Sequence, residues 1–262
     1  MKSQENITSH RSIAVVTWLA LTWLVTSMPA VAQNAYITNQ GIYPNFSNTV
    51  TVIDTTTNKV VTTVDVGLAP AGVAVTPDGS KVYVANEAVN GTVSVIDTAT
   101  NAVSATVAVG RHPTGVAIKP DGSRIYVVNR GNGTVSVLDA TNKEVATIDV
   151  GLAPFGVAVT PDGSRAYVTN LNNTVSIIDT ATNAVSATIS VGKGPLGIAF
   201  TPDGSKAYIA NELDHTVSVI AIPSNTVVGT IHVGTSPIAF GIFILPNFSH
   251  PPLNPHSSKP QR

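Results

Sequence analysis

Residues 156–192 read GVAVTPDGSRAYVTNLNNTVSIIDTATNAVSATISVG, and this stretch decides the fold. Four short apolar runs rich in Val, Ile, Thr and Tyr alternate with turn-forming residues. Residues of these types fit the pleated, half-buried surface of a strand. In Pro161-Asp162-Gly163 the proline presets the first turn position, the aspartate bonds nearby backbone and the glycine accepts a positive φ. The stretch therefore predicts a four-stranded antiparallel meander.

The chain contains this unit five times. A tyrosine opens the second run of each copy and an asparagine closes it: Tyr36 and Asn39, Tyr83 and Asn86, Tyr126 and Asn129, Tyr167 and Asn170, Tyr208 and Asn211. The tyrosines lie 47, 43, 41 and 41 residues apart. A period near 42 in a chain made of strands is typical of a propeller blade or a solenoid coil.

One of the repeated motifs carries a family resemblance. Residues 167–170 spell YVTN, and YITN at 36, YVAN at 83, YVVN at 126 and YIAN at 208 occur beside PDGS and TVSVID motifs. The chain resembles the YVTN-repeat β-propeller family, whose members include surface-layer and other exported proteins of prokaryotes. The resemblance covers residues 35 to about 245 and implies an all-β propeller. The five copies of each strand type in this chain predict five four-stranded blades.

The strand order predicts how the ring of blades closes. By resemblance, GVAV is the innermost strand, YVTN the second, TVSVID the third and AVSATVAVG the outermost. The chain begins with a second strand at Ala35 and ends with an innermost strand at residues 241–244. We therefore expect this C-terminal strand to complete the N-terminal blade and close a monomeric ring, which would remove exposed strand edges. Many relatives are seven-bladed, so an open ring, or one completed by another molecule, is the alternative.

The two ends of the chain predict export and a tail. Residues 1–32 combine Lys2 and Arg11 with an apolar run over 13–25 and small residues before Gln33, a pattern typical of a signal peptide. An uncleaved anchor is the alternative; after cleavage we expect no membrane span in the propeller domain, residues 33–245. Export implies a periplasmic, cell-surface or secreted protein. Residues 246–262 are rich in proline and polar residues and are predicted to be disordered.

Charge and cysteine content exclude some classes of protein. The formal net charge is −1, and it becomes −2 when residues 1–32, with two basic residues and one acidic residue, are removed. Such a balance lacks the basic face that nucleic-acid binding requires, so no nucleic acid is expected as a partner. The chain has no cysteine, so the fold must be stable without disulfides.

No catalytic, metal or cofactor motif stands out in the sequence. Residues 192–197, GKGPLG, match the spacing GxGxxG, but a strand and a PDGS turn follow instead of the helix that a dinucleotide needs. The chain has no GxSxG, HExxH or calcium-loop pattern. We therefore predict no catalytic residues, no metal ligands and no cofactor.

The candidate binding residues lie where the repeats differ. Loops from the second to the third strand, and from the outermost strand to the next innermost strand, emerge on the same side because strands alternate in direction. The first copy inserts nine residues, 40–48, where the other copies use three to five. Variable loops on a rigid scaffold are where binding residues concentrate. The candidates are Tyr43, Phe46, Glu87, Arg111, His112, Arg130, Lys193, Glu212, Asp214 and His215.

Two classes of function follow from this pattern. The first is an exported, non-catalytic binding or interaction propeller, whose partner is an unknown protein, glycan or other envelope component. The second is a hydrolase or lyase that acts in the central mouth, as in the propeller lactonases that the repeat loosely resembles. Glu87, His112 and His215 would be its candidate acid, base or metal-binding residues.

Overall fold

The computed structural model describes residues 33–239. The chain divides into two compact units, residues 1–32 and residues 33–262, and the second of them contains every described residue. The predicted signal peptide, the tail over 246–262 and the closing strand over 241–244 lie outside the described residues. Their assignments therefore stay predictions.

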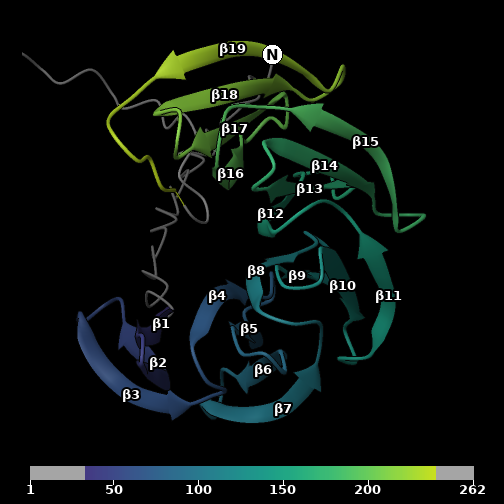
Figure 1. Cartoon of the computed structure of the whole chain (residues 1–262). Helices are drawn as coiled ribbons and strands as arrows, with labels where there is room; N and C mark the ends of the chain where they lie inside the picture. The colour runs from purple at the N-terminus through teal and green to yellow at the C-terminus, as the bar shows by residue number, and fades with distance from the viewer. Residues whose placement is uncertain (1–32, 240–262) are drawn as a thin grey trace, which may run out of the picture. The chain divides into compact units, whose positions relative to one another are not determined.

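The described residues form nineteen strands in five antiparallel sheets and no helix (Figure 1). The strands of the first two sheets are β1 (Asn34–Ile42), β2 (Asn45–Asp54) and β3 (Lys59–Asp65), then β4 (Pro70–Val75), β5 (Lys81–Asn86), β6 (Thr92–Asp97) and β7 (Ala102–Ala108). The third sheet contains β8 (Pro113–Ile118), β9 (Arg124–Asn129), β10 (Thr134–Asp139) and β11 (Glu144–Asp149). The last two contain β12 (Pro154–Val159), β13 (Arg165–Asn170), β14 (Thr174–Asp179) and β15 (Ala184–Ser190), then β16 (Pro195–Phe200), β17 (Lys206–Asn211), β18 (Thr216–Ala221) and β19 (Thr226–His232).

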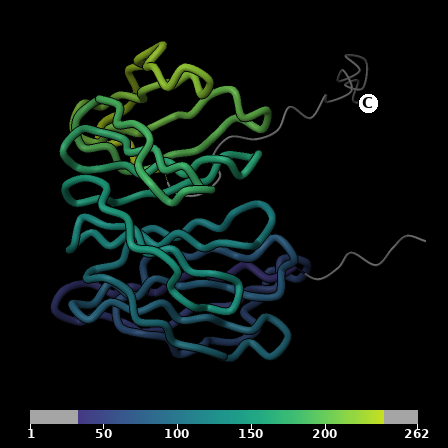
Figure 2. The backbone as a smooth tube through the Cα atoms, turned by 90° about the vertical axis from the view of Figure 1, so that its right-hand side faces the viewer, coloured from purple at the N-terminus to yellow at the C-terminus, as the bar shows by residue number. Residues whose placement is uncertain are grey.

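Each sheet is a meander in which neighbouring strands are consecutive in the chain. The inner strands of successive sheets pack against one another in chain order, β4 with β8, β8 with β12 and β12 with β16. The backbone trace in Figure 2 passes from sheet to sheet in the same order, as its colours show. This arrangement is the predicted β-propeller. The first sheet has three strands among the described residues, and the strand expected to complete it lies outside them.

The apolar core lies between successive sheets. One cluster joins Tyr126, Val135 and Val137 of the third sheet to Ala166 and Val168 of the fourth. Equivalent clusters join the first sheet to the second, the second to the third and the fourth to the fifth. The alternating residues of the repeat therefore bury apolar side chains on both faces of each internal blade, since each face has a neighbouring sheet.

The asparagine that closes each second strand ties the blade together. Asn86 Nδ2 donates to Thr92 Oγ1 (2.9 Å) and Ser94 Oγ (3.0 Å) on the adjacent strand β6. A Cβ added to Gly67, which closes the preceding outermost strand, would lie 2.5 Å from this amide group. The asparagines of the later repeats make the same pair of bonds. The repeated Asn and Gly are therefore explained by packing and hydrogen bonding within the scaffold.

The insertion in the first repeat differs from its prediction. We expected residues 40–48 to form a loop, but β1 extends to Ile42 and β2 begins at Asn45, so most of the insertion is a β-ribbon. The register shifts between Asn39 and Gly41, and Gly41 has a φ of 76°. Such a bulge bends the strand pair and lets the ribbon leave the blade.

No helix of sufficient length and apolar character to span a membrane occurs within residues 33–239.

Candidate functional site

Two sets of loops meet on one edge of the sheets, which we call the variable rim. It consists of the loops after the second strands, residues 40–48, 87–91, 130–133, 171–173 and 212–215, and the loops between sheets, residues 66–69, 109–112, 150–153, 191–194 and 233–236. Backbone bonds join the two sets. The N–H of Glu87 donates to the carbonyl of Ala69 (2.9 Å), and Arg130 makes the same bond to His112 (3.1 Å). Leu171 and Glu212 make the same bond to Ala153 and Gly194, so the first residue of four of these loops is held in place.

Every loop between sheets ends in a residue with positive φ, and a proline follows this residue directly. These residues are Ala69, His112, Ala153, Gly194 and Ser236, with φ values of 54°, 50°, 49°, 64° and 50°. Four of the five are not glycine, and a residue before proline ordinarily avoids helical backbone. Because the same conformation recurs at five equivalent places, the surrounding hydrogen bonds must hold it. This backbone conformation could not be predicted from the sequence, since alanine, histidine and serine carry no signal for positive φ.

A row of polar side chains crosses the variable rim from one sheet to the next. Gln40 Nε2 of the first sheet donates to Glu87 Oε2 of the second (2.8 Å). Glu87 Oε1 lies 3.7 Å from Arg130 Nη1 of the third sheet. The Arg130 guanidinium lies 5.7 Å from the ring centroid of Phe155 in the fourth sheet. We call these four residues the rim row.

The rim row is partly open to solvent. The side chain of Arg130 is 43% exposed and that of Glu87 is 20% exposed. An ion pair with a nitrogen–oxygen distance of 3.7 Å and this exposure contributes little to folding stability. Its charged groups are therefore available to interact with another molecule. Gln40 and Phe155 were not among the candidates, because only the register between sheets places them beside Glu87 and Arg130.

The other predicted basic residues lie next to the rim row. The backbone N–H of Arg111 donates to Asn132 Oδ1 (2.5 Å), and the Arg111 side chain is exposed. A Cβ added to Gly131 would lie 2.9 Å from both Arg111 Cβ and His112 Cδ2. Arg111, His112 and Arg130 thus lie close together around Gly131.

A shallow cavity of about 390 Å³ adjoins Arg130. Its lining comes from two loops of the variable rim, residues 130–133 and 150–153, and from Asp149 at the end of β11. Asp149 and Leu152 both lie in it, and the Leu152 side chain is 73% exposed. Neither residue was a candidate in the sequence analysis.

Three candidates on the fifth sheet serve to hold loops. Asp214 Oδ2 accepts a hydrogen bond from the backbone N–H of Lys193 (2.8 Å). His215 Nδ1 accepts one from the backbone N–H of Ser236 (3.0 Å). Glu212 donates its backbone N–H to Gly194. The ring nitrogen of His215 and the carboxylate of Asp214 are therefore engaged by the backbone, which favours a structural role for both.

The two predicted aromatic residues lie at the tip of the β1–β2 ribbon. Tyr43 is 81% exposed and Phe46 is 43% exposed. Their ring centroids lie 6.1 Å apart in an edge-to-face arrangement. The structure brings these two candidates together.

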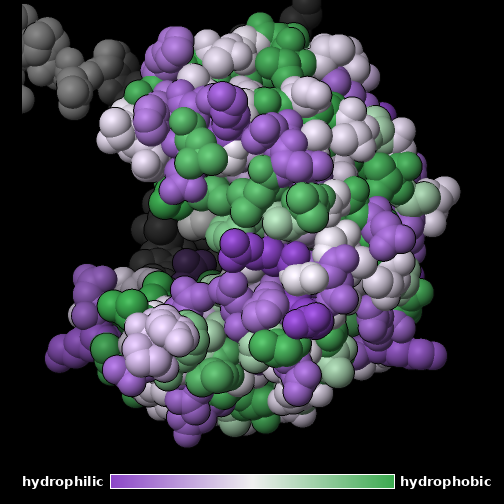
Figure 3. Space-filling view, in the orientation of Figure 1, coloured by the Kyte–Doolittle hydropathy of each residue, from purple (hydrophilic) through white to green (hydrophobic). Residues whose placement is uncertain are grey.

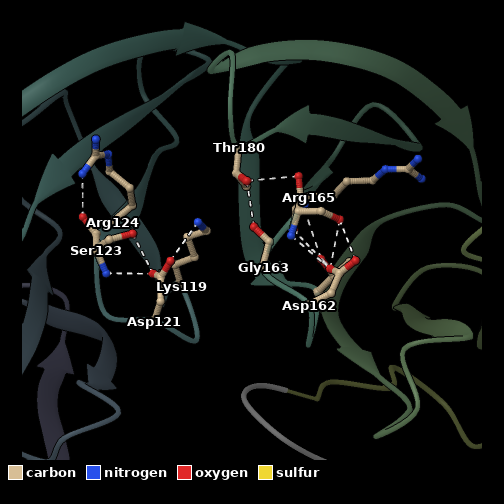
Figure 4. Close-up of polar contacts among 10 residues, drawn as sticks. Lys119, Asp121, Ser123, Arg124, Asp162, Gly163, Arg165 and Thr180 are labelled. Carbon is tan, nitrogen blue, oxygen red and sulfur yellow. Dashed lines mark hydrogen bonds and ion pairs between the residues drawn. The ribbon is translucent and has the colours of Figure 1, made fainter.

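The opposite edge, which we call the turn rim, is occupied by its own hydrogen bonds (Figure 4). In one turn Asp121 Oδ1 accepts bonds from the backbone N–H (2.9 Å) and hydroxyl (2.6 Å) of Ser123. Similar bonds, led by that from the Thr76 hydroxyl, lower the pKa of Asp78 to about 2. Side-chain and backbone hydrogen bonds, led by the Thr201 hydroxyl, likewise lower the pKa of Asp203 to about 2. Recurring aspartates here stabilise turns, as predicted.

The described residues contain no group of three or more His, Cys, Asp or Glu side chains placed to hold a metal ion. Comparison with known proteins assigns the fold to a family. The sequence profile of a family described as "Lactonase, 7-bladed beta-propeller" matches residues 37–235. The chain belongs to this lactonase family. The comparison with curated proteins gives no match.

The solved structures that resemble this lactonase-family chain include the following two. Hydrazine synthase of Kuenenia stuttgartiensis is 31% identical with a TM-score of 0.60, and the match covers 62% of this chain and 48% of the other. A functionally unknown protein from Desulfotomaculum acetoxidans DSM 771 is 24% identical with a TM-score of 0.65, covering 78% of this chain and 71% of the other. This chain spans about half the length of the hydrazine synthase chain, and the second similarity supports the fold alone.

The family match confirms the predicted propeller but differs in blade number. The family is described as seven-bladed, whereas the described residues of this member form five sheets. The narrower resemblance to YVTN-repeat proteins is not shown by the match and stays a prediction.

Proposed function

We propose that this lactonase-family propeller is an exported binding protein that holds a polar or anionic component of the cell envelope on its variable rim. The partner would be a protein, a glycan or another envelope component, and its binding would involve no catalysis. The observation that carries the proposal is the rim row, in which successive sheets contribute Gln40, Glu87, Arg130 and Phe155 to one surface.

The charged side chains of the two rims differ in whether hydrogen bonds within the scaffold already engage them. On the turn rim the aspartates accept hydrogen bonds from their own turns. Lys81 Nζ donates to the carbonyl of Ala140 (3.2 Å), so this cation also makes a hydrogen bond within the scaffold. On the variable rim Arg111 and Arg130 are exposed. Arginine binds carboxylate and phosphate groups with two parallel hydrogen bonds, so these residues suit an anionic partner.

The aromatic ribbon adds a second contact area. Tyr43 and Phe46 expose apolar surface on a ribbon that projects from the first blade. Exposed aromatic residues are frequent anchors of interfaces, and their burial would supply most of the binding energy. The face in Figure 3 carries hydrophobic residues in separate groups between hydrophilic ones, which is ordinary for a protein surface.

The test is retention of the labelled chain on the native envelope fraction. The variant Arg111→Ala with Arg130→Ala, and a second variant Tyr43→Ala with Phe46→Ala, should each be retained about tenfold less than the unchanged chain. The matched control is Lys59→Ala with Lys143→Ala, two exposed cations on the turn rim. Equal retention of the variable-rim variants and the control, with melting temperatures unchanged, would contradict the proposal.

Lactone hydrolysis is the second candidate function, and the family match favours it. The Glu87 carboxylate would act as the base for an attacking water, and the Arg130 guanidinium would stabilise the negative charge that develops on the carbonyl oxygen. A screen of simple lactones and esters tests this reaction. If the chain is a hydrolase, Glu87→Gln should lower kcat about a hundredfold or more. If the chain only binds, no turnover above the uncatalysed rate will be found.

A further inference from the structure

Each loop between sheets ends in two residues that can present their backbone N–H groups to one acceptor. The second of the two has positive φ, for example 49° at Ala153 and 64° at Gly194. Successive N–H groups in such a conformation form a concave site, a nest, which binds anionic or polar acceptor atoms. We call these two residues the nest of the loop.

Most nests are filled by acceptors from the protein itself. In four loops the second N–H donates to a neighbouring loop of the variable rim: Ala69 to the carbonyl of Ser47 (2.8 Å), His112 to the carbonyl of Ala88 (3.0 Å), Gly194 to Asn173 Oδ1 (3.1 Å) and Ser236 to His215 Nδ1 (3.0 Å). In the nest of Lys193 and Gly194 the first N–H donates to a carboxylate, Asp214 Oδ2 (2.8 Å). A carboxylate oxygen therefore fits such a nest.

The nest of Leu152 and Ala153 is open. Neither N–H donates a hydrogen bond to any atom of residues 33–239. Gly133 occupies the position of Asn173 and His215, with φ values of 73°, 69° and 58°, but it has no side chain to accept the bond from Ala153. The second N–H of this open nest therefore lacks an internal acceptor.

The first N–H of the open nest lacks an acceptor because a neighbouring loop is short. Loop 171–173 has three residues, whereas loops 130–133 and 212–215 have four. The third residue of each longer loop, Asn132 or Asp214, accepts the first N–H of the preceding nest. No side chain of the shorter loop makes this bond.

The open nest lines the cavity of about 390 Å³ beside Arg130. Arg130 lies between Glu87, whose Oε1 is 3.7 Å from Nη1, and the ring of Phe155, whose centroid is 5.7 Å from the guanidinium. A planar guanidinium binds a carboxylate through two parallel hydrogen bonds. Two N–H groups and one guanidinium therefore provide donors for an anionic group in this cavity.

Asp149 adds an acceptor to the same cavity. Its carboxylate makes no hydrogen bond or ion pair in the described part of the chain. A ligand that is anionic throughout, such as phosphate, would be repelled by this carboxylate, whereas hydroxyl groups would donate to it. The Leu152 side chain, 73% exposed, offers apolar surface to the C–H groups of a sugar ring. A matching ligand therefore carries one carboxylate and several hydroxyl groups.

We propose that the open nest and Arg130 bind the carboxylate of an acidic sugar unit, whose hydroxyl groups donate to Asp149. This inference rests on the proposed function, because it names the anionic group that the variable rim holds. Sites for small ligands have volumes of about 300–1,000 Å³. A cavity of about 390 Å³ lies in the lower part of this range and suits a single sugar unit.

A titration followed by amide NMR tests the class of ligand. Glucuronate should shift the amide signals of Leu152 and Ala153, whereas glucose and inorganic phosphate at the same concentrations should not. An equal response to phosphate or to glucose would overturn the assignment to an acidic sugar, and no shift at these amides would overturn the role of the nest. Because the probe is a defined sugar acid, either result leaves the proposed function to be decided by retention on the envelope fraction.

The variant Gly133→Asn should fill the open nest from within. Asn173 has a φ of 69° and accepts the Gly194 N–H, so asparagine at position 133 should accept the Ala153 N–H in the same way. Glucuronate binding should weaken about tenfold or more, and hydrogen exchange at amide 153 should slow. Slow exchange at amide 153 together with an unchanged affinity for glucuronate would contradict the proposal.

The variant Arg130→Ala tests the site without a new side chain at position 133, where a Cβ would lie 3.0 Å from the carbonyl oxygen of Gly151. It should weaken glucuronate binding about tenfold. The matched control, Lys143→Ala, removes an exposed cation from the turn rim and should leave the affinity unchanged. Equal affinities of Arg130→Ala and the control would overturn the proposal.

Discussion

At the scale of single residues, the aspartates of the PDGS turns show why one polar residue type recurs throughout the chain. Asp203 Oδ1 accepts bonds from the backbone N–H (3.0 Å) and hydroxyl (2.9 Å) of Ser205. These bonds form only when the turn is folded and favour the ionised carboxylate. The hydrogen bond from the Thr201 hydroxyl, followed by these two from Ser205, lowers the pKa of the Asp203 carboxyl from the usual 3.8 to about 2 in the folded protein.

Acid should consequently destabilise the propeller. Because the folded-state pKa values of Asp78 and Asp203 are lowered, the ionised groups stabilise the fold fully above about pH 4, and this contribution is lost as the pH falls toward 2. The melting temperature should decrease over this window, and Asp203→Asn should reduce the decrease, since it removes one titrating group. A melting temperature that is equal or higher at pH 2 than at pH 4 would contradict this account.

His215 should act as a hydrogen-bond acceptor rather than as a catalytic group. His215→Ala removes the acceptor of the Ser236 N–H and should speed hydrogen exchange at that amide, with a loss of about 0.5–1.5 kcal/mol. His215→Asn should restore protection, because Asn173 Oδ1 accepts from the Gly194 N–H (3.1 Å) at the equivalent place. Equal exchange at amide 236 in the unchanged chain and both variants would exclude this role.

At the scale of elements, close contact between inner strands limits side-chain size. A Cβ on Gly156 of β12 would overlap the carbonyl oxygen of Leu196 on β16 and would lie 3.1 Å from Thr169 Oγ1. Gly156→Ala should therefore lower the free energy of unfolding by about 1–3 kcal/mol in urea denaturation. Gly234→Ala is the control, since no atom lies within 4 Å of its added Cβ. An equal free energy of unfolding for the two variants would show that the inner strands can move apart without loss of stability, which would contradict this account.

The strands could be predicted from the sequence, whereas the site could be predicted only in part. Repeated asparagines and PDGS turns mark the strand ends because their side-chain hydrogen bonds are made within their own blade. The repeated tyrosines mark the second strand of each blade, although their hydroxyls reach the next sheet. The rim row depends on the register between sheets, which no local pattern encodes, so Glu87 and Arg130 were candidates while Gln40 and Phe155 were not. The ribbon over residues 40–48 was missed because Gly41 and Pro44 are typical of loops.

At the scale of the whole molecule, the predicted export can be tested by mass. If residues 1–32 are removed, the mature chain begins at Gln33 and contains neither Trp18 nor Trp23, the only two tryptophans. We expect an intact mass that corresponds to residues 33–262 and a fluorescence spectrum without tryptophan emission. A cell-associated product with the full mass would favour the uncleaved anchor.

The central claim is that this propeller binds through the variable rim, and hydrogen–deuterium exchange tests it most directly. Exchange of the mature chain would be compared with and without its native envelope fraction. Peptides that contain Gln40, Glu87 and Arg130 should become protected, and peptides that contain the turns over 76–80 and 201–205 should not change. Protection confined to those turns, or no change in any peptide at saturating envelope fraction, would contradict the claim.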